Sequence, residues 1–284
     1  MGCNPDDPEP TPTNYIIQGP QDLFPAFSPD GEQIAYFHEA WDSPDPPEGY
    51  PSGLYIIDKD GGSRSLVLEA GYINSPSWSP DGEWLVFSNS GVIQKCKRDG
   101  SELTTFDGLD DVEGGFFFPD WTPDGEYILF DRAINEEGVS NLFSMTADFA
   151  EAQPIFGITL IASRNVELSP THPKIVYMKA SAEWPHWEIF LANVQGTSNQ
   201  RLTQGKDNRD PSWSPDGNQI AWSRDGQLSL MNADGSNQRR IAFGNNPSWS
   251  VNSDIVYSHA NADYTKEVLY TISSDGKNQT QITF

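Results

Sequence analysis

Pro211-Ser212-Trp213-Ser214-Pro215-Asp216-Gly217 is the stretch that decides the fold of this chain, because the same pattern recurs along the sequence. Close copies read PAFSPDG at 25–31, PSWSPDG at 76–82 and PDWTPDG at 119–125, and degraded copies read VELSPTH at 166–172 and PSWSVNS at 247–253. The third residue of each copy, termed the anchor, is in order Phe27, Trp78, Trp121, Leu168, Trp213 and Trp249. Six spaced copies indicate a repeat architecture.

Further strand-like segments follow each anchor. Second strands are expected at 33–37, 84–88, 127–131, 174–178, 219–223 and 254–258, and third strands at 54–58, 92–96, 142–146, 189–193, 228–232 and 268–272. An Asp-Gly turn and a short fourth strand, such as 200–203, end each unit. The 270 residues from Tyr15 to Phe284 give 45 residues per unit, which is the length of a four-stranded propeller blade. The sequence therefore predicts an all-β, six-bladed β-propeller with four-stranded antiparallel blades.

The composition of these segments supports the same fold. The strands are short and rich in β-branched and aromatic residues, and the Asp-Gly pairs suit turn positions with positive φ. The second strands are apolar at successive positions, as expected for blades covered on both faces by their neighbours. Residues 15–19 and 281–284 both read as fourth strands. We expect these terminal strands to close the ring, with 15–19 docked against the last blade.

The first 14 residues differ from the rest of the chain. They read MGCNPDDPEPTPTN, with four prolines and three acidic residues, and predict a disordered tail before a propeller at 15–284. Gly2-Cys3 followed by an acidic, proline-rich linker resembles the start of a mature bacterial lipoprotein, in which the cysteine carries the lipid. The acidic run also resembles the surface-export signal of Bacteroidetes lipoproteins. The alternative is a chance cysteine near a polar terminus.

The repeat itself resembles a known family. The P-x-W-S-P-D-G string, the apolar strand after it and the later Asp-Gly turn are similar to the repeats of the TolB-type β-propeller family, which is WD-repeat-like. The resemblance covers residues 15–284. It implies a propeller in a bacterial periplasm or at the outer membrane or cell surface. It says little about function, because propellers host many functions.

The formal net charge of −24 bears on possible partners. Such a field repels nucleic-acid phosphates and anionic lipid headgroups, so we expect no nucleic acid and a membrane attachment only through a lipid on Cys3. This negative charge either keeps the protein soluble or attracts a cationic partner. We expect a monomer.

One register position stands out as a candidate binding site. The residue just past each second strand is polar and never acidic, and in order these residues are His38, Asn89, Arg132, Lys179, Arg224 and His259. If the register holds, they form a ring on one face, termed the polar ring. It binds a ligand, or else its members bond loop carbonyls and neighbouring carboxylates.

Two long loops on the same face carry aromatic residues. Residues 38–53 contain Trp41, and residues 179–187 contain Trp184 and Trp187. These tryptophans either bind sugars, peptides or proline-rich segments or pack over the blade edge. The segments before the anchors add Phe24, Phe116, Phe118, Asp210 and Asn246 near this rim.

No motif for catalysis is found in the sequence. It contains no G-x-S-x-G, H-E-x-x-H, P-loop or C-x-x-C, and we expect no cofactor, no metal and no catalytic residue. The leading hypothesis is a non-catalytic binding or scaffold protein of the bacterial cell envelope with a protein or peptide partner. A carbohydrate-binding propeller that uses the loop tryptophans is the second. A metal-dependent enzyme similar to polysaccharide lyases, using His38 and His259 together with His186 or an acidic residue, is the third.

Overall fold

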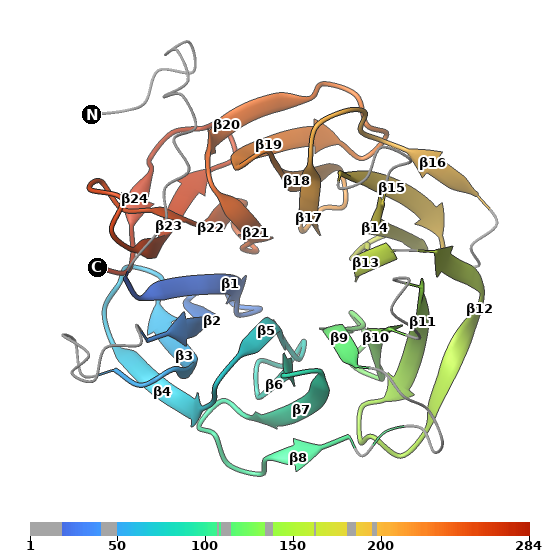
Figure 1. Cartoon of the computed structure of the whole chain (residues 1–284), viewed down its shortest axis with the longest axis horizontal. Helices are drawn as coiled ribbons and strands as arrows, with labels where there is room; N and C mark the ends of the chain where they lie inside the picture. The colour runs from blue at the N-terminus through green and yellow to red at the C-terminus, as the bar shows by residue number, and fades with distance from the viewer. Residues whose placement is uncertain are drawn as a thin grey trace.

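The fold is seen in a computed structural model that describes residues 19–40, 50–106, 108, 115–133, 139–161, 163–180, 186–194 and 198–284. Strands are arranged in a ring around a central opening, and successive units follow one another around it (Figure 1). Within these residues no helix is long and apolar enough to cross a membrane. The predicted tail at 1–14 and the segment 15–18 lie outside the described residues.

The anchors end the innermost strands. These first strands are β1 (Gln21–Phe27), β5 (Ile73–Trp78), β9 (Phe116–Trp121), β13 (Ser163–Leu168), β17 (Asn208–Trp213) and β21 (Asn245–Trp249). The second strands are β2 (Gln33–Glu39), β6 (Trp84–Asn89), β10 (Tyr127–Ala133), β14 (Lys174–Ala180), β18 (Gln219–Arg224) and β22 (Asp254–Ala260). All the predicted second strands are confirmed.

The third and fourth strands lie toward the outside of the ring. The third strands are β3 (Gly53–Asp58), β7 (Val92–Lys97), β11 (Val139–Thr146), β15 (Trp187–Asn193), β19 (Gln227–Asn232) and β23 (Glu267–Ser273). The fourth strands are β4 (Arg64–Glu69), β8 (Thr104–Thr105), β12 (Ala152–Ile161), β16 (Asn199–Arg201), β20 (Arg239–Phe243) and β24 (Thr280–Gln281). The predicted third strands are also confirmed.

The pairing of these strands shows an all-β propeller. Four separate four-stranded antiparallel sheets are formed within the described residues by β5–β8, β9–β12, β13–β16 and β17–β20. The remaining strands, β1–β4 and β21–β24, belong to one eight-stranded sheet. A single parallel pair, Gln21 with Glu267, joins β1 to β23 in that sheet. Each run of four consecutive strands is called a unit below.

The sequence motif explains how neighbouring units hold together. The indole Nε1–H of Trp78 donates to the carbonyl oxygen of Ala26 (3.1 Å), and that of Trp213 donates to Glu167 (3.3 Å). Trp249 bonds Ser212 in the same way, at 3.2 Å. Trp78 and Trp213 are buried and Trp249 is half-buried, and each of the three also bonds the first strand of the preceding unit.

The Ser-Pro-Asp-Gly part of the motif forms a self-contained turn. Ser214 Oγ donates to Asp216 Oδ1 (2.7 Å) and accepts from the N–H of Gln219 (2.9 Å), while Gly217 takes a φ of 69°. The repeated carboxylates therefore satisfy turn donors, as expected for hairpin turns.

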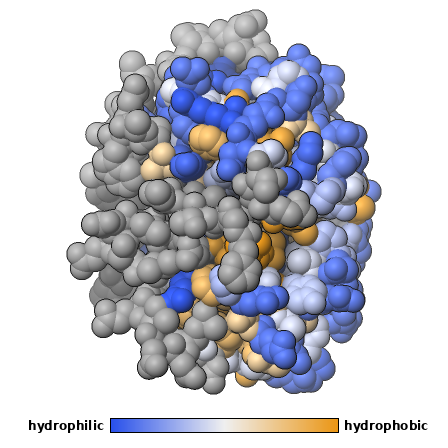
Figure 2. Space-filling model, turned by 90° about the vertical axis from the view of Figure 1, so that its right-hand side faces the viewer, coloured by the Kyte–Doolittle hydropathy of each residue, from blue (hydrophilic) through white to orange (hydrophobic). Residues whose placement is uncertain are grey.

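On the side of the ring seen in Figure 2, the coloured surface is mostly hydrophilic with smaller hydrophobic groups.

Candidate functional site

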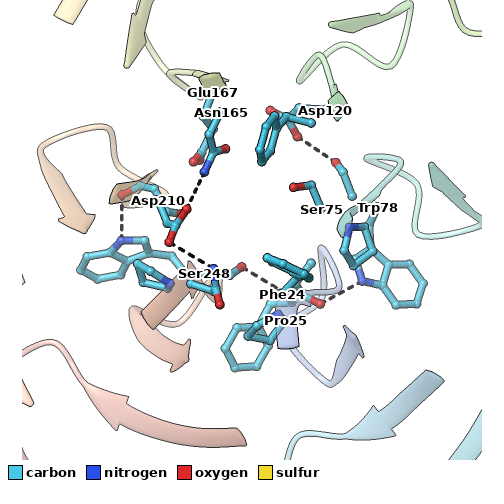
Figure 3. A pocket seen from close by; sticks show the side chains of 18 of the residues that line it. Phe24, Pro25, Ser75, Trp78, Asp120, Asn165, Glu167, Asp210 and Ser248 are labelled. Carbon is cyan, nitrogen blue, oxygen red and sulfur yellow. Dashed lines mark hydrogen bonds between the residues drawn. The ribbon is translucent and has the colours of Figure 1, made fainter. Parts of the chain in front are cut away.

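A cavity of about 420 Å³ lies at the centre of the ring, where the first strands converge (Figure 3). Its lining comes from β1, β5, β9, β13, β17 and β21 and from the turns that follow them. A volume of this size lies in the usual range for ligand pockets. This central cavity is the candidate functional site.

Each first strand is bulged where it passes the cavity. The register of the first and second strands shifts at this point in every unit, for example between Leu23 and Ala26 in β1. In five of the six units a proline follows the bulged residue, and the fourth unit has Val166 there. Since proline has no N–H to donate to the ladder, the first residue of the P-x-W motif fits a bulge.

The bulged residues share a left-handed backbone conformation. Their φ values lie between 46° and 53°, and all of them line the cavity: Phe24, Ser75, Phe118, Asn165, Asp210 and Asn246. Asn and Asp adopt this conformation readily, but for a bulky residue such as phenylalanine it is strained. Phe24 and Phe118 are therefore held against a cost of about 1–3 kcal/mol each. Strain of this kind concentrates at functional sites.

The lining has two chemically different sides. Among the bulged residues, the first three units contribute two aromatic rings, Phe24 and Phe118, whereas the last three contribute two amides and a carboxylate. Asp210 accepts hydrogen bonds from the amide groups of Asn165 (3.4 Å) and Asn246 (3.1 Å). Figure 3 shows the bond between Asn165 and Asp210. The cavity can therefore receive an apolar group on one side and a hydrogen-bonding or cationic group on the other.

A second ring of lining residues lies two positions beyond the bulges. At this position four units have Ala or Ser, but the third and fourth have Asp120 and Glu167. Asp120 accepts a hydrogen bond from Ser77 Oγ (2.8 Å), and Glu167 Oε1 accepts one from the backbone N–H of Trp213 (3.0 Å). These side chains bond the adjacent units across the cavity wall.

The cavity shifts the ionisation of its carboxyl groups. Burial raises the pKa of Asp120 and of Asp210 to about 6. The pKa of Glu167 is also raised well above its usual value, first by burial and then by the negative charge of Asp120. All three keep some exposure to the cavity. A positively charged group bound there would stabilise the ionised carboxylates, because opposite charges favour each other's charged forms.

The sequence identified only part of this cavity. Four of the residues expected near the rim line this cavity: Phe24, Phe118, Asp210 and Asn246. Phe116 instead packs against Phe106 and Phe130, with ring centroids 5.5 and 5.7 Å away. The predictions did not include four other lining residues: Ser75, Asp120, Asn165 and Glu167. The acidic pair could have been noticed, because it replaces the Ser found at the same position of other repeats.

The polar ring lies elsewhere. None of its six residues lines the central cavity among the described residues. Most contact an aromatic side chain on the third strand of their own unit: His38 contacts Tyr55, Arg132 contacts Phe143, Lys179 contacts Phe190 and His259 contacts Tyr270. Asn89 donates to Gln94 Oε1 (3.0 Å), and the Nε atoms of Arg132 and Arg224 are buried without an acceptor in the described structure. Ligand binding by this ring stays a prediction.

The remaining predicted residues are placed only in part. Trp41, Trp184 and Cys3 lie outside the described residues, whereas Trp187 is buried in β15 and 6% exposed. Nδ1 of His38 lies 2.7 Å from Asp22 Oδ1, and burial lowers the pKa of His259. Within the described part of the chain, no group of three or more His, Cys, Asp or Glu side chains is arranged to hold a metal ion.

Solved structures with the same fold include two TolB proteins. TolB from Acinetobacter baumannii is 20% identical, with a TM-score of 0.71 over 89% of this chain and 64% of that one. The putative TolB from Agrobacterium tumefaciens is also 20% identical, with a TM-score of 0.66 over 78% of this chain and 84% of that one. An oligogalacturonate lyase in complex with manganese is 12% identical, with a TM-score of 0.61 over 93% and 77% of the two chains. At these identities the likeness shows the fold alone.

This chain spans 64% of the length of the A. baumannii protein. A comparison with curated proteins finds no significant match. The family model described as the TolB beta propeller domain matches residues 12–251, which include all six anchors of the repeated motif. The chain therefore belongs to the TolB β-propeller family.

Proposed function

We propose that this protein is a non-catalytic binding protein of the bacterial cell envelope that holds a protein or peptide partner at its central cavity. The observation that carries the proposal is the ring of bulged residues, which keeps two phenylalanines in a strained conformation around that cavity. The TolB-like fold of the chain supports a scaffold or binding role. We also propose that the ring has six blades. In this proposal the eight-stranded sheet consists of two blades, β1–β4 and β21–β24, joined at their edges.

The lining of the cavity supports a particular kind of partner segment. Asp120, Glu167 and Asp210 favour a lysine or arginine side chain, because a net charge of −24 and burial both raise the cost of leaving them unpaired. Phe24 and Phe118 favour a neighbouring aliphatic or aromatic side chain. The proposed partner is therefore a segment with a cationic residue next to an apolar one.

The location of the protein is part of the same proposal. The family and the predicted lipid on Cys3 support the bacterial envelope, at the periplasmic side or at the cell surface. Mass spectrometry of the native protein extracted from membranes tests the anchor. A diacylated or triacylated Cys3 is expected, and an unmodified Cys3 contradicts it.

Selection of binders from a random peptide library displayed on phage tests the partner site. Peptides bound by the unaltered protein are expected to contain Lys or Arg beside an apolar residue. Asp210→Asn is expected to weaken binding of the selected peptides about tenfold, because it removes a charge-assisted contact of about 1.5–3 kcal/mol. Affinity is measured by titration calorimetry at pH 7.5.

The matched control is Asp60→Asn, which removes the same charge from an exposed outer turn. This variant is expected to bind the selected peptides as the unaltered protein does. Selected peptides that lack a cation, or that bind Asp210→Asn and the control equally well, contradict the proposed site.

A further inference from the structure

A second cavity, of about 430 Å³, is lined by residues of the unit β5–β8 and the unit β9–β12 and shares no residue with the central cavity. Figure 1 shows these two units next to each other in the ring. Buried Lys95 and Trp121 and half-buried Trp84 line it. Three exposed carboxylates also belong to its lining: Asp81, Asp124 and Asp148. We call this cavity the inter-unit pocket.

Lys95 departs from the repeat at this pocket. It pairs with Val86 in the strand register, and the equivalent residues of the other units are Ile56, Ser144, Leu191, Leu230 and Thr271. Lys95 thus places an ammonium group where other units have an aliphatic or hydroxyl side chain. It is only 9% exposed, and burial lowers the pKa of its ammonium group while Asp148 opposes this shift. A buried lysine is costly unless its donors are satisfied.

Phe149 is a second departure at the same place. In the turns between third and fourth strands, the equivalent position is a glycine with a φ of 82° to 86°: Gly61, Gly100, Gly235 and Gly276. Phe149 takes a φ of 68° there, which is strained for a phenylalanine. Its ring lies 4.7 Å from Lys95 Nζ. A phenylalanine with a strained backbone conformation therefore contacts Lys95.

The contacts of Lys95 orient its ammonium group at the pocket. Nζ donates to the carbonyl oxygen of Ala147 and lies 5.3 Å from the ring of Trp84. Among the described residues, Trp121 Nε1 is buried without an acceptor, although the indoles of Trp78, Trp213 and Trp249 all bond the preceding unit. The pocket therefore contains an ammonium group held in place, a half-exposed indole ring and an unused buried N–H donor.

The charges around the pocket restrict its ligand. Each of Asp81, Asp124 and Asp148 uses Oδ1 for bonds inside its own turn. Hydrogen bonds in the turns lower the pKa of all three carboxyl groups, so they are ionised at neutral pH. They disfavour an anionic ligand, whereas Lys95 disfavours a cationic one. A neutral ligand with hydroxyl groups can donate to the carboxylates, accept from the ammonium and stack on the indole of Trp84.

From these features we infer that the inter-unit pocket is a binding site for a neutral saccharide. Its hydroxyl groups bond Asp81, Asp124 and Lys95, and its apolar ring face packs on Trp84. This site goes beyond the proposed partner site, since the two cavities share no lining residue.

An array of immobilised neutral oligosaccharides built from glucose, galactose, mannose and N-acetylglucosamine tests the inference, with titration calorimetry of the strongest binder. Trp84→Gln gives this unit the residue found at Gln33 and Gln219 in other units, and Lys95→Met keeps an unbranched apolar chain. Each substitution is expected to lower affinity about tenfold, which corresponds to about 1.4 kcal/mol. Trp84→Gln removes the stacking surface, and Lys95→Met removes a charge-assisted hydrogen bond.

Tyr127→Gln is the matched control, because Tyr127 is equivalent to Trp84 in the next unit and does not line the pocket. Its affinity is expected to stay within about twofold of the unaltered value, a difference below about 0.5 kcal/mol. The inference is overturned if no neutral oligosaccharide binds, if only acidic ones bind, or if Trp84→Gln binds as well as the control. Circular dichroism and melting temperature establish that each variant is folded.

Discussion

Replacing Trp222 with alanine is expected to lower the free energy of unfolding by about 4 kcal/mol, a large fraction of the stability of a typical domain. The Trp222 side chain is fully buried between the units β13–β16 and β17–β20, in a cluster that includes Trp213 and Trp187. Its Nε1–H also donates to Asn208 Oδ1 (3.0 Å). The substitution leaves a large cavity and an unpaired buried amide oxygen, and each of these is costly.

The bond to Asn208 extends this effect to the loops around it. Asn208 Nδ2 donates to the carbonyl oxygen of Gly205 (2.9 Å) and approaches Glu188 Oε2 (3.4 Å). Glu188 is buried and accepts from Arg201 (2.8 Å) and Thr203 (2.7 Å). Loss of the indole of Trp222 therefore also weakens a polar network that joins the two units.

Urea unfolding followed by circular dichroism measures the change. Trp84→Ala is the control, because it deletes the same side chain from a half-buried position. Its expected cost is about 1 kcal/mol. If Trp222→Ala costs no more than this control, packing between units is not what stabilises the ring.

The carboxylates in the central cavity are expected to lower the stability of the protein as the pH rises from about 4.5 to about 7. The folded-state pKa values of Asp120 and Asp210 are raised to about 6, and that of Glu167 is raised as well. In the unfolded chain these groups titrate near pH 4. Between the two values the folded state binds more protons than the unfolded state, so raising the pH costs stability.

The size of this loss follows from the shifts. A shift of two units corresponds to about 2.7 kcal/mol for a fully buried group, and the partial exposure of these carboxylates reduces it. We expect a total loss of about 2–3 kcal/mol between pH 4.5 and pH 7. His259 acts in the opposite direction, because its pKa is lowered and the unfolded state binds the extra proton.

Urea midpoints measured from pH 4.5 to 7.5 test the prediction. Asp120→Asn removes one titrating group and also the negative charge that raises the pKa of Glu167, so it is expected to make the dependence on pH shallower by more than a third. The contribution of His259 is the same in both proteins and cancels in their difference. A pH dependence that Asp120→Asn leaves unchanged would show that the cavity carboxylates do not cause it.

Local sequence signals predicted the strands well. A short apolar segment bounded by Asp-Gly or Pro-Asp-Gly turns predicts each second strand. The segment and its turns lie within about ten residues of one another in the sequence. In five of the six units a proline two residues before the anchor also fits the bulge, because its missing N–H interrupts the ladder. Position before the anchors was therefore enough to predict four of the residues near the rim: Phe24, Phe118, Asp210 and Asn246.

For the polar ring, the register of the repeat predicted the positions of the residues but not their contacts. His38, Arg132 and Lys179 do occupy equivalent positions, as the repeat indicated. Their side chains contact third-strand aromatics of their own units. Equivalence along the chain predicts corresponding positions, but it does not give the neighbours of each side chain, and ligand binding by this ring stays a prediction.

By itself, the sequence determined the repeat, the strands, the turns and the family, because each depends on residues close together in the chain. Only the tertiary structure decided which side chains meet. Asn165, Asp210 and Asn246 come from three units and form one hydrogen-bonded group only after the ring places the first strands around a common axis. Lys95, Trp84 and Asp148 line one pocket for the same reason, because a strand of one unit meets a turn of the next.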